Sequence, residues 1–342
     1  MWSVWQAERN LYFNSFFVQA EGGNLVVDPL VLSAEDAREI EERGGVAWIA
    51  ITNRDHERDA RALAQRFGAK LITSELEAPL LSGAVDRTVR DGETFGGARV
   101  VALEGLKTPG EFALHFPEKS ALLLGDALWG SPAGALRLMP DEKLADPPRA
   151  VLSLRKLRAL LPEHLLVGDG ACIFGGAHRA IWATLEARTD VCVNRINADE
   201  LPWKSWDQEP LEYGARSREV GDHIGAEKLG YRIVELLPSQ ATCPLHWHAG
   251  EEELFVVLSG RPLLVAPSGE WPLRAGDYLC FPTRAAGAHK IVNRSAEPSE
   301  LLLISNVDPG DVCLYPDSKK ILVERVGLML RSEPELDYWD GE

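Results

Sequence analysis

The sequence predicts two domains, a layered α/β domain followed by an all-β domain, and three observations indicate this. The chain has 342 residues, enough for two domains that each bury a core. In the first half, apolar runs of strand length are interrupted by helical patterns that end at glycines. In the second half, short β-runs follow one another at a spacing of about eight to twelve residues. We therefore predict domains at 1–188 and 189–342.

Local signals place the elements of the first domain. Glu-Gly-Gly separates two apolar runs, 14–20 and 24–27, which predicts a β-hairpin. Ser33 is expected to cap a helix that ends at Gly44. Further helices are predicted at 56–67, at 154–161 behind a Ser153 cap, and at 176–188, and further strands at 46–52, 70–73, 99–103, 111–116, 121–124 and 165–167. Paired strands interrupted by helices predict a layered α/β domain.

The second domain is predicted to consist of short strands punctuated by Gly, Pro and Asp. Such a series is typical of an all-β sandwich or barrel. The predicted strands are 231–237, 254–258, 263–267, 278–281, 289–293 and 301–307.

One stretch of this domain, PLHWHAGEEELFVVLSG at 244–260, carries the strongest chemical signal in the chain. His246 and His248 are two positions apart on a β-type run, so both side chains point to the same face while Trp247 points away. Glu253 stands at the head of the next apolar run and can reach the two histidines from a neighbouring strand. Two imidazoles and a carboxylate are a ligand set for a borderline metal.

The second half resembles the cupins, double-stranded β-helix barrels of the jelly-roll type. Their first motif is matched by His246, His248, Glu253 and Gly260, with Gln240 in place of the leading glycine. Their second motif is matched by Gly276, Pro282, His289 and Asn293, with Arg284 where a turn glycine is common. The resemblance covers about 195–325 and implies that His289 is a fourth ligand. It also implies a homodimer, because cupins commonly pair through their sheets.

Three imidazole nitrogens and one carboxylate oxygen suit one divalent transition metal, which is Zn, Fe, Ni, Co, Cu or Mn. Four protein ligands leave a five- or six-coordinate ion open to water or substrate. The alternative is a set of barrel histidines without metal. Apolar residues that point to the same side of their strands as the ligands are expected to line the pocket, namely Phe255, Val257 and Ile291. The candidates for orienting a substrate are Tyr278, Cys280 and Arg284.

The first half resembles the metallo-β-lactamase fold, an αββα layered domain, in the order of VVDPL, TNRDHERD, LKTPGEFALHFPEKSALLLGDAL and LLVGDG. The family's metal motifs are degraded here. Where the family has His, His, Asp and His, this chain has Asn53, Asp55, Glu57 and Arg58. Lys107 and Asp169 stand at two further histidine positions, and only Asp126 matches.

These departures predict a catalytically inactive first domain. Arg58 is never deprotonated in a protein, and Lys107 cannot ligate while it carries a proton, so both repel a dication. Two interpretations remain open. The loops hold a carboxylate site for a hard metal or a repurposed pocket that uses His56, or the former metal site now holds only salt bridges.

Composition limits the partners. The formal charge of −16 and a pI near 5.0 exclude a phosphate-binding surface, so we expect no nucleic-acid partner. No run of eighteen apolar residues exists, and the N-terminus has no signal-peptide pattern, so neither a membrane span nor secretion is expected. Five scattered cysteines without a CxxC pair suit reduced thiols, which indicates the cytoplasm.

Three functions fit these patterns. The first is a metal-dependent enzyme that acts on a small organic molecule, of the oxygenase, isomerase or lyase type. The second is a non-catalytic protein that binds or senses a small molecule. The third is a hydrolase that uses the remaining carboxylates of the first domain. The sequence does not name catalytic residues or a substrate.

Overall fold

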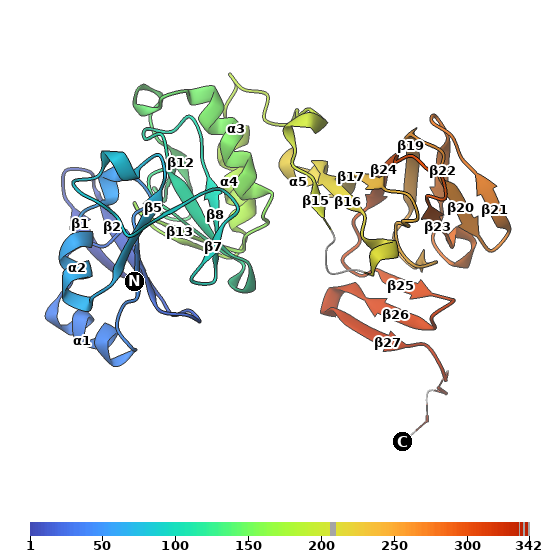
Figure 1. The fold of residues 1–342 in the computed structure, drawn as a ribbon, viewed down its shortest axis with the longest axis horizontal. Coiled ribbons are helices and arrows are strands. Elements are labelled where there is room, and N and C mark those ends of the chain that lie inside the picture. The colour runs from blue at the N-terminus through green and yellow to red at the C-terminus, as the bar shows by residue number, and fades with distance from the viewer. Residues whose placement is uncertain (206–209, 335, 338, 341–342) are drawn as a thin grey trace. The chain divides into compact units, whose positions relative to one another are not determined.

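The computed structural model describes residues 1–342 except 206–209, 335, 338, 341 and 342. It divides the chain into two compact units, Met1–Val193 and Asn194–Glu342 (Figure 1). The first unit is mixed α/β and the second is built mainly of strands, so the predicted fold class is confirmed. Within the described residues, the helices are all too short or too polar to cross a membrane.

The first unit contains two six-stranded sheets. One has the order β1-β2-β3-β4-β5-β6 and the other the order β14-β13-β10-β9-β8-β7. The strands of the first sheet are β1 (Trp2–Gln6), β2 (Leu11–Val18), β3 (Leu25–Val27), β4 (Trp48–Ala50), β5 (Lys70–Ser74) and β6 (Arg87–Val89). Those of the second are β7 (Thr94–Phe95), β8 (Ala98–Ala102), β9 (Phe112–Phe116), β10 (Ala121–Leu124), β13 (His164–Val167) and β14 (Ile173–Phe174), and a separate hairpin joins β11 (Leu128–Trp129) to β12 (Arg137–Leu138).

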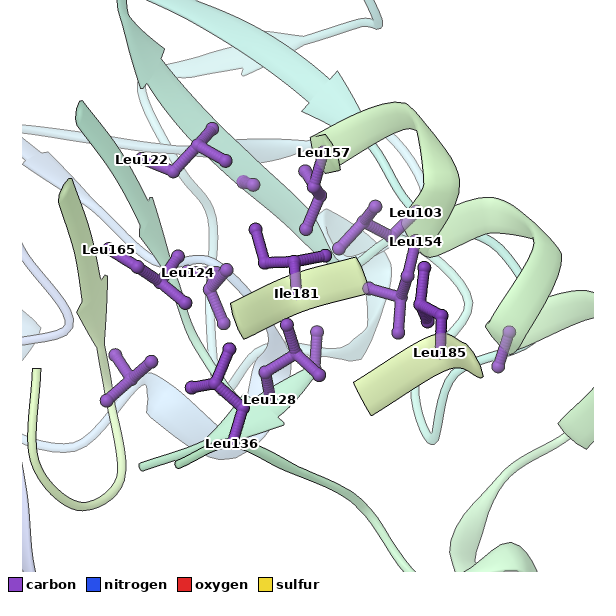
Figure 2. Packing of buried hydrophobic residues seen from close by; sticks show 14 of the residues in the cluster. Leu103, Leu122, Leu124, Leu128, Leu136, Leu154, Leu157, Leu165, Ile181 and Leu185 are labelled. Atoms are coloured by element: carbon purple, nitrogen blue, oxygen red, sulfur yellow. The ribbon is translucent and has the colours of Figure 1, made fainter. Parts of the chain in front are cut away.

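Alternating side chains along the central strands produce four layers. Leu25 and Val27 of β3 lie in the core between the two sheets, whereas Val26 packs in the core beneath α1 (Ala34–Glu42) and α2 (Ala60–Phe67). In β10, Leu122 and Leu124 face α3 (Pro147–Arg158) and α4 (Ala177–Glu186), as Figure 2 shows. The result is the predicted αββα arrangement, with every central strand buried on both faces.

The predicted N-terminal hairpin and first helix are confirmed. Strands β2 and β3 pair antiparallel, and the Ser33 hydroxyl accepts a hydrogen bond from the Asp36 amide at the start of α1. The strand β1, which adds one more antiparallel partner, was not predicted.

The predicted helix behind a Ser153 cap is wrong at its start. Helix α3 begins at Pro147, seven positions earlier than predicted. Asp146 caps the helix by accepting a hydrogen bond from the Arg149 amide, and Pro147 stands in the first turn. Ser153 lies inside the helix, where its hydroxyl accepts a hydrogen bond from the Glu104 amide. Two capping signals competed, and the proline next to Asp146 marks the one that the chain uses.

The predicted helix at 56–67 is also shorter than expected. Arg54–His56 form a single 3₁₀ turn that the Asn53 side chain caps, and α2 begins only at Ala60. Between them Arg58 has a φ of 37°, in the left-handed region, which interrupts a right-handed helix. Gly68 ends the helix in a left-handed conformation, as predicted.

The described residues of the second unit form three antiparallel sheets, of six, four and three strands. The six-stranded sheet has the order β15-β16-β17-β24-β19-β22, the four-stranded sheet β18-β25-β26-β27, and the three-stranded sheet β21-β20-β23. The bounds are β15 (Lys204–Ser205), β16 (Arg216–Glu219), β17 (Leu229–Leu236), β18 (Trp247–His248), β19 (Glu253–Ser259), β20 (Leu263–Ala266), β21 (Gly269–Pro272), β22 (Tyr278–Phe281), β23 (Lys290–Val292), β24 (Ser299–Asn306), β25 (Val312–Tyr315), β26 (Lys320–Val323) and β27 (Leu328–Arg331), with one short helix, α5 (Val220–His223).

Candidate metal centre

The fold brings the four predicted ligands of the second unit together. We call His246, His248, Glu253 and His289 the histidine–glutamate cluster. His246 and His289 form an antiparallel β-bridge, in which each amide donates to the other's carbonyl at 3.2 and 2.9 Å. His248 lies on β18, and Glu253 is the first residue of β19. Because the ligands come from three backbone segments, long-range strand pairing fixes their spacing.

The three imidazoles point the same nitrogen at one carboxylate oxygen. The Nε2 atoms of His246, His248 and His289 lie 3.8, 3.6 and 3.3 Å from Glu253 Oε2. The side chain of His289 is also stacked on the Phe281 ring, with ring centroids 3.6 Å apart. The three imidazoles therefore gather around Glu253 Oε2, and the donor atoms of His246, Glu253 and His289 all lie within 4.8 Å of one another.

Hydrogen bonds fix the tautomer of each ring. His248 Nδ1 lies 2.6 Å from Asp311 Oδ2, and His289 Nδ1 lies 2.9 Å from the Gly287 carbonyl. His246 Nδ1 lies 3.1 Å from the Pro244 carbonyl. Since these oxygens only accept, each Nδ1 carries a proton, and Nε2 is the nitrogen that faces Glu253.

Two atoms of the cluster are buried without a hydrogen-bond partner, Glu253 Oε2 and His289 Nε2. Although they lie 3.3 Å apart, a lone pair on a neutral imidazole and a carboxylate oxygen do not attract each other. Leaving a buried polar atom unpaired costs roughly 1–3 kcal/mol. A cation bound between the four side chains would give both Glu253 Oε2 and His289 Nε2 a partner.

Burial sets the protonation states of the cluster. Desolvation lowers the pKa of His246 to about 4 and that of His289 to about 3. Desolvation also raises the pKa of Glu253 to about 6. At neutral pH the imidazoles of His246 and His289 are neutral and the carboxylate is ionised, which are the forms that bind a metal.

In the metal-free protein, the contribution of His246 and His289 to stability is expected to fall as the pH falls from about 6.5 toward 4. In the unfolded chain these two residues bind protons near their ordinary pKa of 6.5, so over this window they bind more protons in the unfolded state. Buried carboxyls act in the opposite direction, because the pKa is raised to about 6 in Glu253 and Asp169 and to about 8 in Glu111. The test therefore compares wild type with His289→Gln by urea unfolding after chelation, and the variant should lose less stability than wild type between pH 7 and pH 5. An equal change in the two proteins would contradict this assignment.

Asp311 was not predicted as part of the site. It is buried, and its second oxygen accepts from the Gly250 amide at 2.7 Å, so the carboxylate is held in place while it orients His248. Ionisation is favoured, because hydrogen bonds from His248 and Gly250 help to keep the pKa of Asp311 below its usual range despite burial. No spacing rule links residue 311 to residue 248, since their contact depends on the pairing of β18 with β25.

Asp311→Asn is expected to lower the metal affinity of the cluster by about 10- to 100-fold, because a carboxylate that accepts from a ligating histidine fixes its tautomer and raises its basicity. Zinc titration by calorimetry measures the change. Asp308→Asn is the matched control. Asp308 lies in the same loop, and its side chain accepts from the Gly310 amide instead of from His248. An affinity that is unchanged in Asp311→Asn would contradict this role.

A cavity of about 250 Å³ opens beside the cluster. Phe255 lines it, as predicted, and so do Arg232, Thr242, Cys243, Glu251, Leu303, Ser305, Cys313, Tyr315, Leu322 and Glu324. Its wall is therefore mixed in polarity rather than mostly apolar. Arg232, Leu303 and Phe255 are direct partners on β17, β24 and β19, so they form one row across the sheet.

Five of the predicted pocket residues do not line this cavity. Val257 and Ile291 are buried in the hydrophobic core of the unit. Tyr278 is 73% exposed, and Cys280 and Arg284 are also exposed. The reason lies in strand parity, because Tyr278 and Cys280 pair with Val256 and Leu254, which are offset by one residue from Glu253 and Phe255.

Two cysteines lie close to the histidines and were not predicted. Cys243 Sγ is 3.3 Å from His246 Nδ1, and the Cys313 thiol lies near enough to His246 and His248 to share an ion with them. Burial raises the pKa of each thiol to about 12. In the metal-free protein both thiols therefore keep their protons, whereas Glu253 is already ionised at neutral pH.

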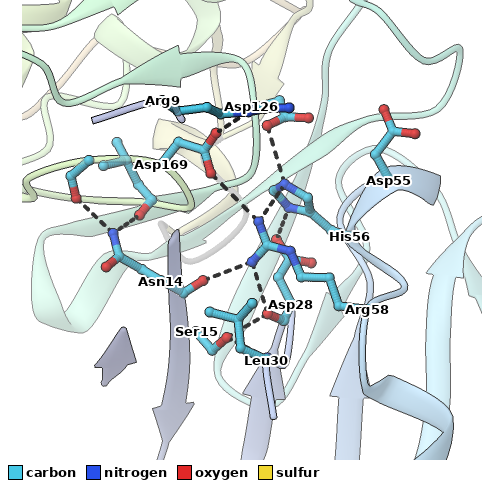
Figure 3. Close-up of polar contacts among 12 residues, drawn as sticks. Arg9, Asn14, Ser15, Asp28, Leu30, Asp55, His56, Arg58, Asp126 and Asp169 are labelled. Atoms are coloured by element: carbon cyan, nitrogen blue, oxygen red, sulfur yellow. Dashed lines mark hydrogen bonds and ion pairs between the residues drawn. The ribbon is translucent and has the colours of Figure 1, made fainter. Parts of the chain in front are cut away.

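The degraded motif positions of the first unit are engaged with one another. Asp55 forms an ion pair with Lys107, and Glu57 pairs with Arg61. The Asn53 side chain accepts from the Asp55 amide. His56, Arg58, Asp126 and Asp169 converge in the interior (Figure 3).

A family model of the metallo-beta-lactamase superfamily matches residues 1–186, more than half of the chain. The chain belongs to the metallo-beta-lactamase superfamily. A second family model, the cupin domain, matches residues 232–305, so a cupin domain follows the metallo-beta-lactamase domain. Both predicted resemblances are confirmed. Curated proteins offer no significant match to the chain.

Solved structures resemble the two domains separately. A metallo-beta-lactamase from Pontibacter korlensis is 17% identical over 54% of this chain and 93% of its own, with a TM-score of 0.45. A sugar phosphate isomerase of the cupin superfamily from Silicibacter pomeroyi is 24% identical over 43% of this chain and 98% of its own, with a TM-score of 0.37. Neither likeness assigns an activity to this chain.

Proposed function

We propose that the cupin domain is a metal-dependent enzyme that acts on a small organic molecule, of the oxygenase, isomerase or lyase type. Its ion would be one divalent transition metal held by His246, His248, His289 and Glu253. The observation that carries this proposal is the pair of buried, unpartnered atoms, Glu253 Oε2 and His289 Nε2, which face the Nε2 atoms of the two other histidines.

The donor set fits such an ion. Three imidazole nitrogens and one carboxylate oxygen suit Zn, Fe, Ni, Co, Cu or Mn better than an ion that prefers oxygen alone. When bound, the metal would supply Lewis-acid or oxygen-dependent chemistry next to the cavity.

The cavity walls define what can enter. A volume of about 250 Å³ admits a small molecule and not a polymer. Phe255 and Leu303 offer apolar contact, whereas Arg232 offers a positive charge at the same row of the sheet. Tyr315 stays protonated, since burial raises the pKa of its phenol, and it can donate a hydrogen bond. These residues would orient a small, partly apolar and partly polar substrate.

The test uses the full chain, stripped of metal and reloaded with each candidate ion in turn. Each preparation is incubated with a panel of small organic acids, diketones and sugars, and products are followed by mass spectrometry. Turnover with one or more ions, absent from the stripped protein and from His246→Ala, supports the proposal. Ligand-dependent stabilisation without product in any preparation would instead favour the non-catalytic binding protein.

A cytoplasmic location, a homodimer and the absence of nucleic-acid partners stay predictions from the sequence.

A further inference from the structure

Five charged residues form a buried network in the metallo-beta-lactamase domain, which we call the first-unit charge cluster. It consists of Asp28, His56, Arg58, Asp126 and Asp169 (Figure 3). His56 is held on both sides, with Nδ1 2.8 Å from Asp28 Oδ2 and Nε2 3.2 Å from Asp126 Oδ1. Asp28 also accepts from the Thr52 amide at 2.8 Å and from the Thr52 hydroxyl at 2.6 Å.

The superfamily implies metal in this region, so the cluster has to be compared with what an ion needs. His56, Asp126 and Asp169 offer one nitrogen and two oxygens that lie within 4.8 Å of one another. By donor type alone these three side chains would bind an ion. A zinc ion would have to lie about 2.0–2.2 Å from each nitrogen and oxygen.

The position that such an ion needs is taken by Arg58. Its Nη2 atom lies 2.9 Å from His56 Nε2 and 3.6 Å from Asp169 Oδ1, between two of the three donors. A guanidinium is always charged, so it would repel a dication as well as fill its space. The ion and the guanidinium exclude each other, and the residues as they stand do not fit a metal.

Arg58 is fixed in this position by several contacts. Its Nη1 donates to the Asn14 carbonyl at 3.1 Å and to the Asp28 carbonyl at 3.3 Å. The guanidinium also lies 5.0 Å from the centre of the Phe13 ring, and the side chain is only 11% exposed. Moving Arg58 aside would break these contacts and leave buried Asp169 with Arg9, at 4.0 Å, as its remaining cation partner.

The charges balance without an ion once Arg9 is included, since it lies 4.0 Å from Asp169 Oδ2 and adds a third cation to the three carboxylates. Asp28 and Asp126 flank His56 and raise its pKa to about 10 in spite of burial, so the ring is an imidazolium at neutral pH. The two cations, His56 and Arg58, touch each other and are stable there because three carboxylates surround them. The two acids of the degraded motif, Asp55 and Glu57, have their own partners in Lys107 and Arg61.

We propose that the Arg58 guanidinium replaces the metal in the first unit, which makes this domain metal-free, and that removing it exposes a latent site formed by His56, Asp126 and Asp169. The domain keeps the geometry of a metallohydrolase while a covalently attached cation performs the structural task of the ion. Metal-assisted hydrolysis by this domain would then require the guanidinium to leave its position.

The test measures zinc binding by calorimetry and by elemental analysis. All variants are made in the full chain with His246→Ala and His289→Ala, so that the result does not depend on the function proposed for the cupin domain. The parent double variant should bind no zinc. Adding Arg58→Ala should produce about one bound zinc ion per chain, and adding Asp126→Asn to that protein should abolish the binding. Arg58→Lys, which keeps a cation, and Arg61→Ala, which removes a nearby surface arginine, are the matched controls and should bind none.

Two results would overturn the proposal. One is zinc binding by the parent double variant that Asp126→Asn removes, since the guanidinium would then coexist with an ion. The other is a folded Arg58→Ala protein that binds no zinc. If Arg58→Ala does not fold, zinc should restore the fold, because the ion replaces the lost charge, and a failure to do so counts against the proposal.

Discussion

His289→Ala is expected to abolish metal binding by the cupin domain, with a loss of affinity greater than the roughly 100-fold upper range for residues that only support a ligand. His289 is fully buried, and its Nε2 has no partner other than the proposed ion. Its ring is held by Phe281 and by the Gly287 carbonyl, so the wild-type ligand is already in position before an ion arrives. Elemental analysis of the purified variant, with zinc titration by calorimetry, measures the loss.

His223→Ala is the matched control for this experiment. His223 lies in the same domain, at the end of α5, where its Nδ1 contacts the Glu219 carbonyl at 2.7 Å, and it does not line the cavity. It should keep full metal content. A His289→Ala protein that retains the ion with near-normal affinity would show that the ligand set is wrong.

Asp28→Ala should destabilise the first unit by about 3–5 kcal/mol, the range for breaking a buried ion pair. Asp28 is 1% exposed and joins the Thr52 backbone, the Thr52 hydroxyl and His56. Its removal leaves the His56 imidazolium with one carboxylate instead of two. Urea unfolding of the full chain measures the loss, with hydrogen exchange of the β4 and β5 amides assigning the transition to the first unit.

The matched control for Asp28→Ala is Asp36→Ala. Asp36 is a half-buried acid in the first turn of α1, where its removal should cost about 1 kcal/mol or less. If Asp28→Ala costs no more than Asp36→Ala, the cluster is not a main source of stability in this unit.

The buried strands and the shared face of His246 and His248 could be predicted because their signals are local, whereas the αββα order and His289 were implied by the two family resemblances. Alternation within β3 and β10 decides which side chains face which layer, and the spacing of His246 and His248 puts both on one face of a strand. These patterns do not depend on how distant parts of the chain fold.

The supporting residues could not be predicted, because they depend on which strands pair. Asp311 and Cys313 reach the cluster only because β25 pairs with β18, which places Cys313 opposite His248. Tyr278 and Cys280 were misplaced for the same reason, since their parity follows from their partners on β19. The register between strands that are far apart in the sequence is set by packing, so it cannot be predicted from the periodicity of either strand alone.

Arg58 was predicted to repel a dication, and the former metal site was expected to hold salt bridges as one of two interpretations, but the sequence did not place the guanidinium. Its left-handed backbone turns the side chain away from a helical path, and only the structure places its nitrogen between His56 and Asp169. Nor did the motif point to Asp28, which lies at the end of the N-terminal hairpin and meets His56 across 28 positions of the chain.

Locating the metal by anomalous scattering in crystals of the full chain, loaded with the ion that elemental analysis identifies, tests the central claim most directly. The account predicts one ion per chain, bound by the Nε2 atoms of His246, His248 and His289 and by a Glu253 oxygen, with no anomalous peak near Asp126. An ion held by His56, Asp126 and Asp169, or a metal-saturated protein without an ion at Glu253, would contradict it.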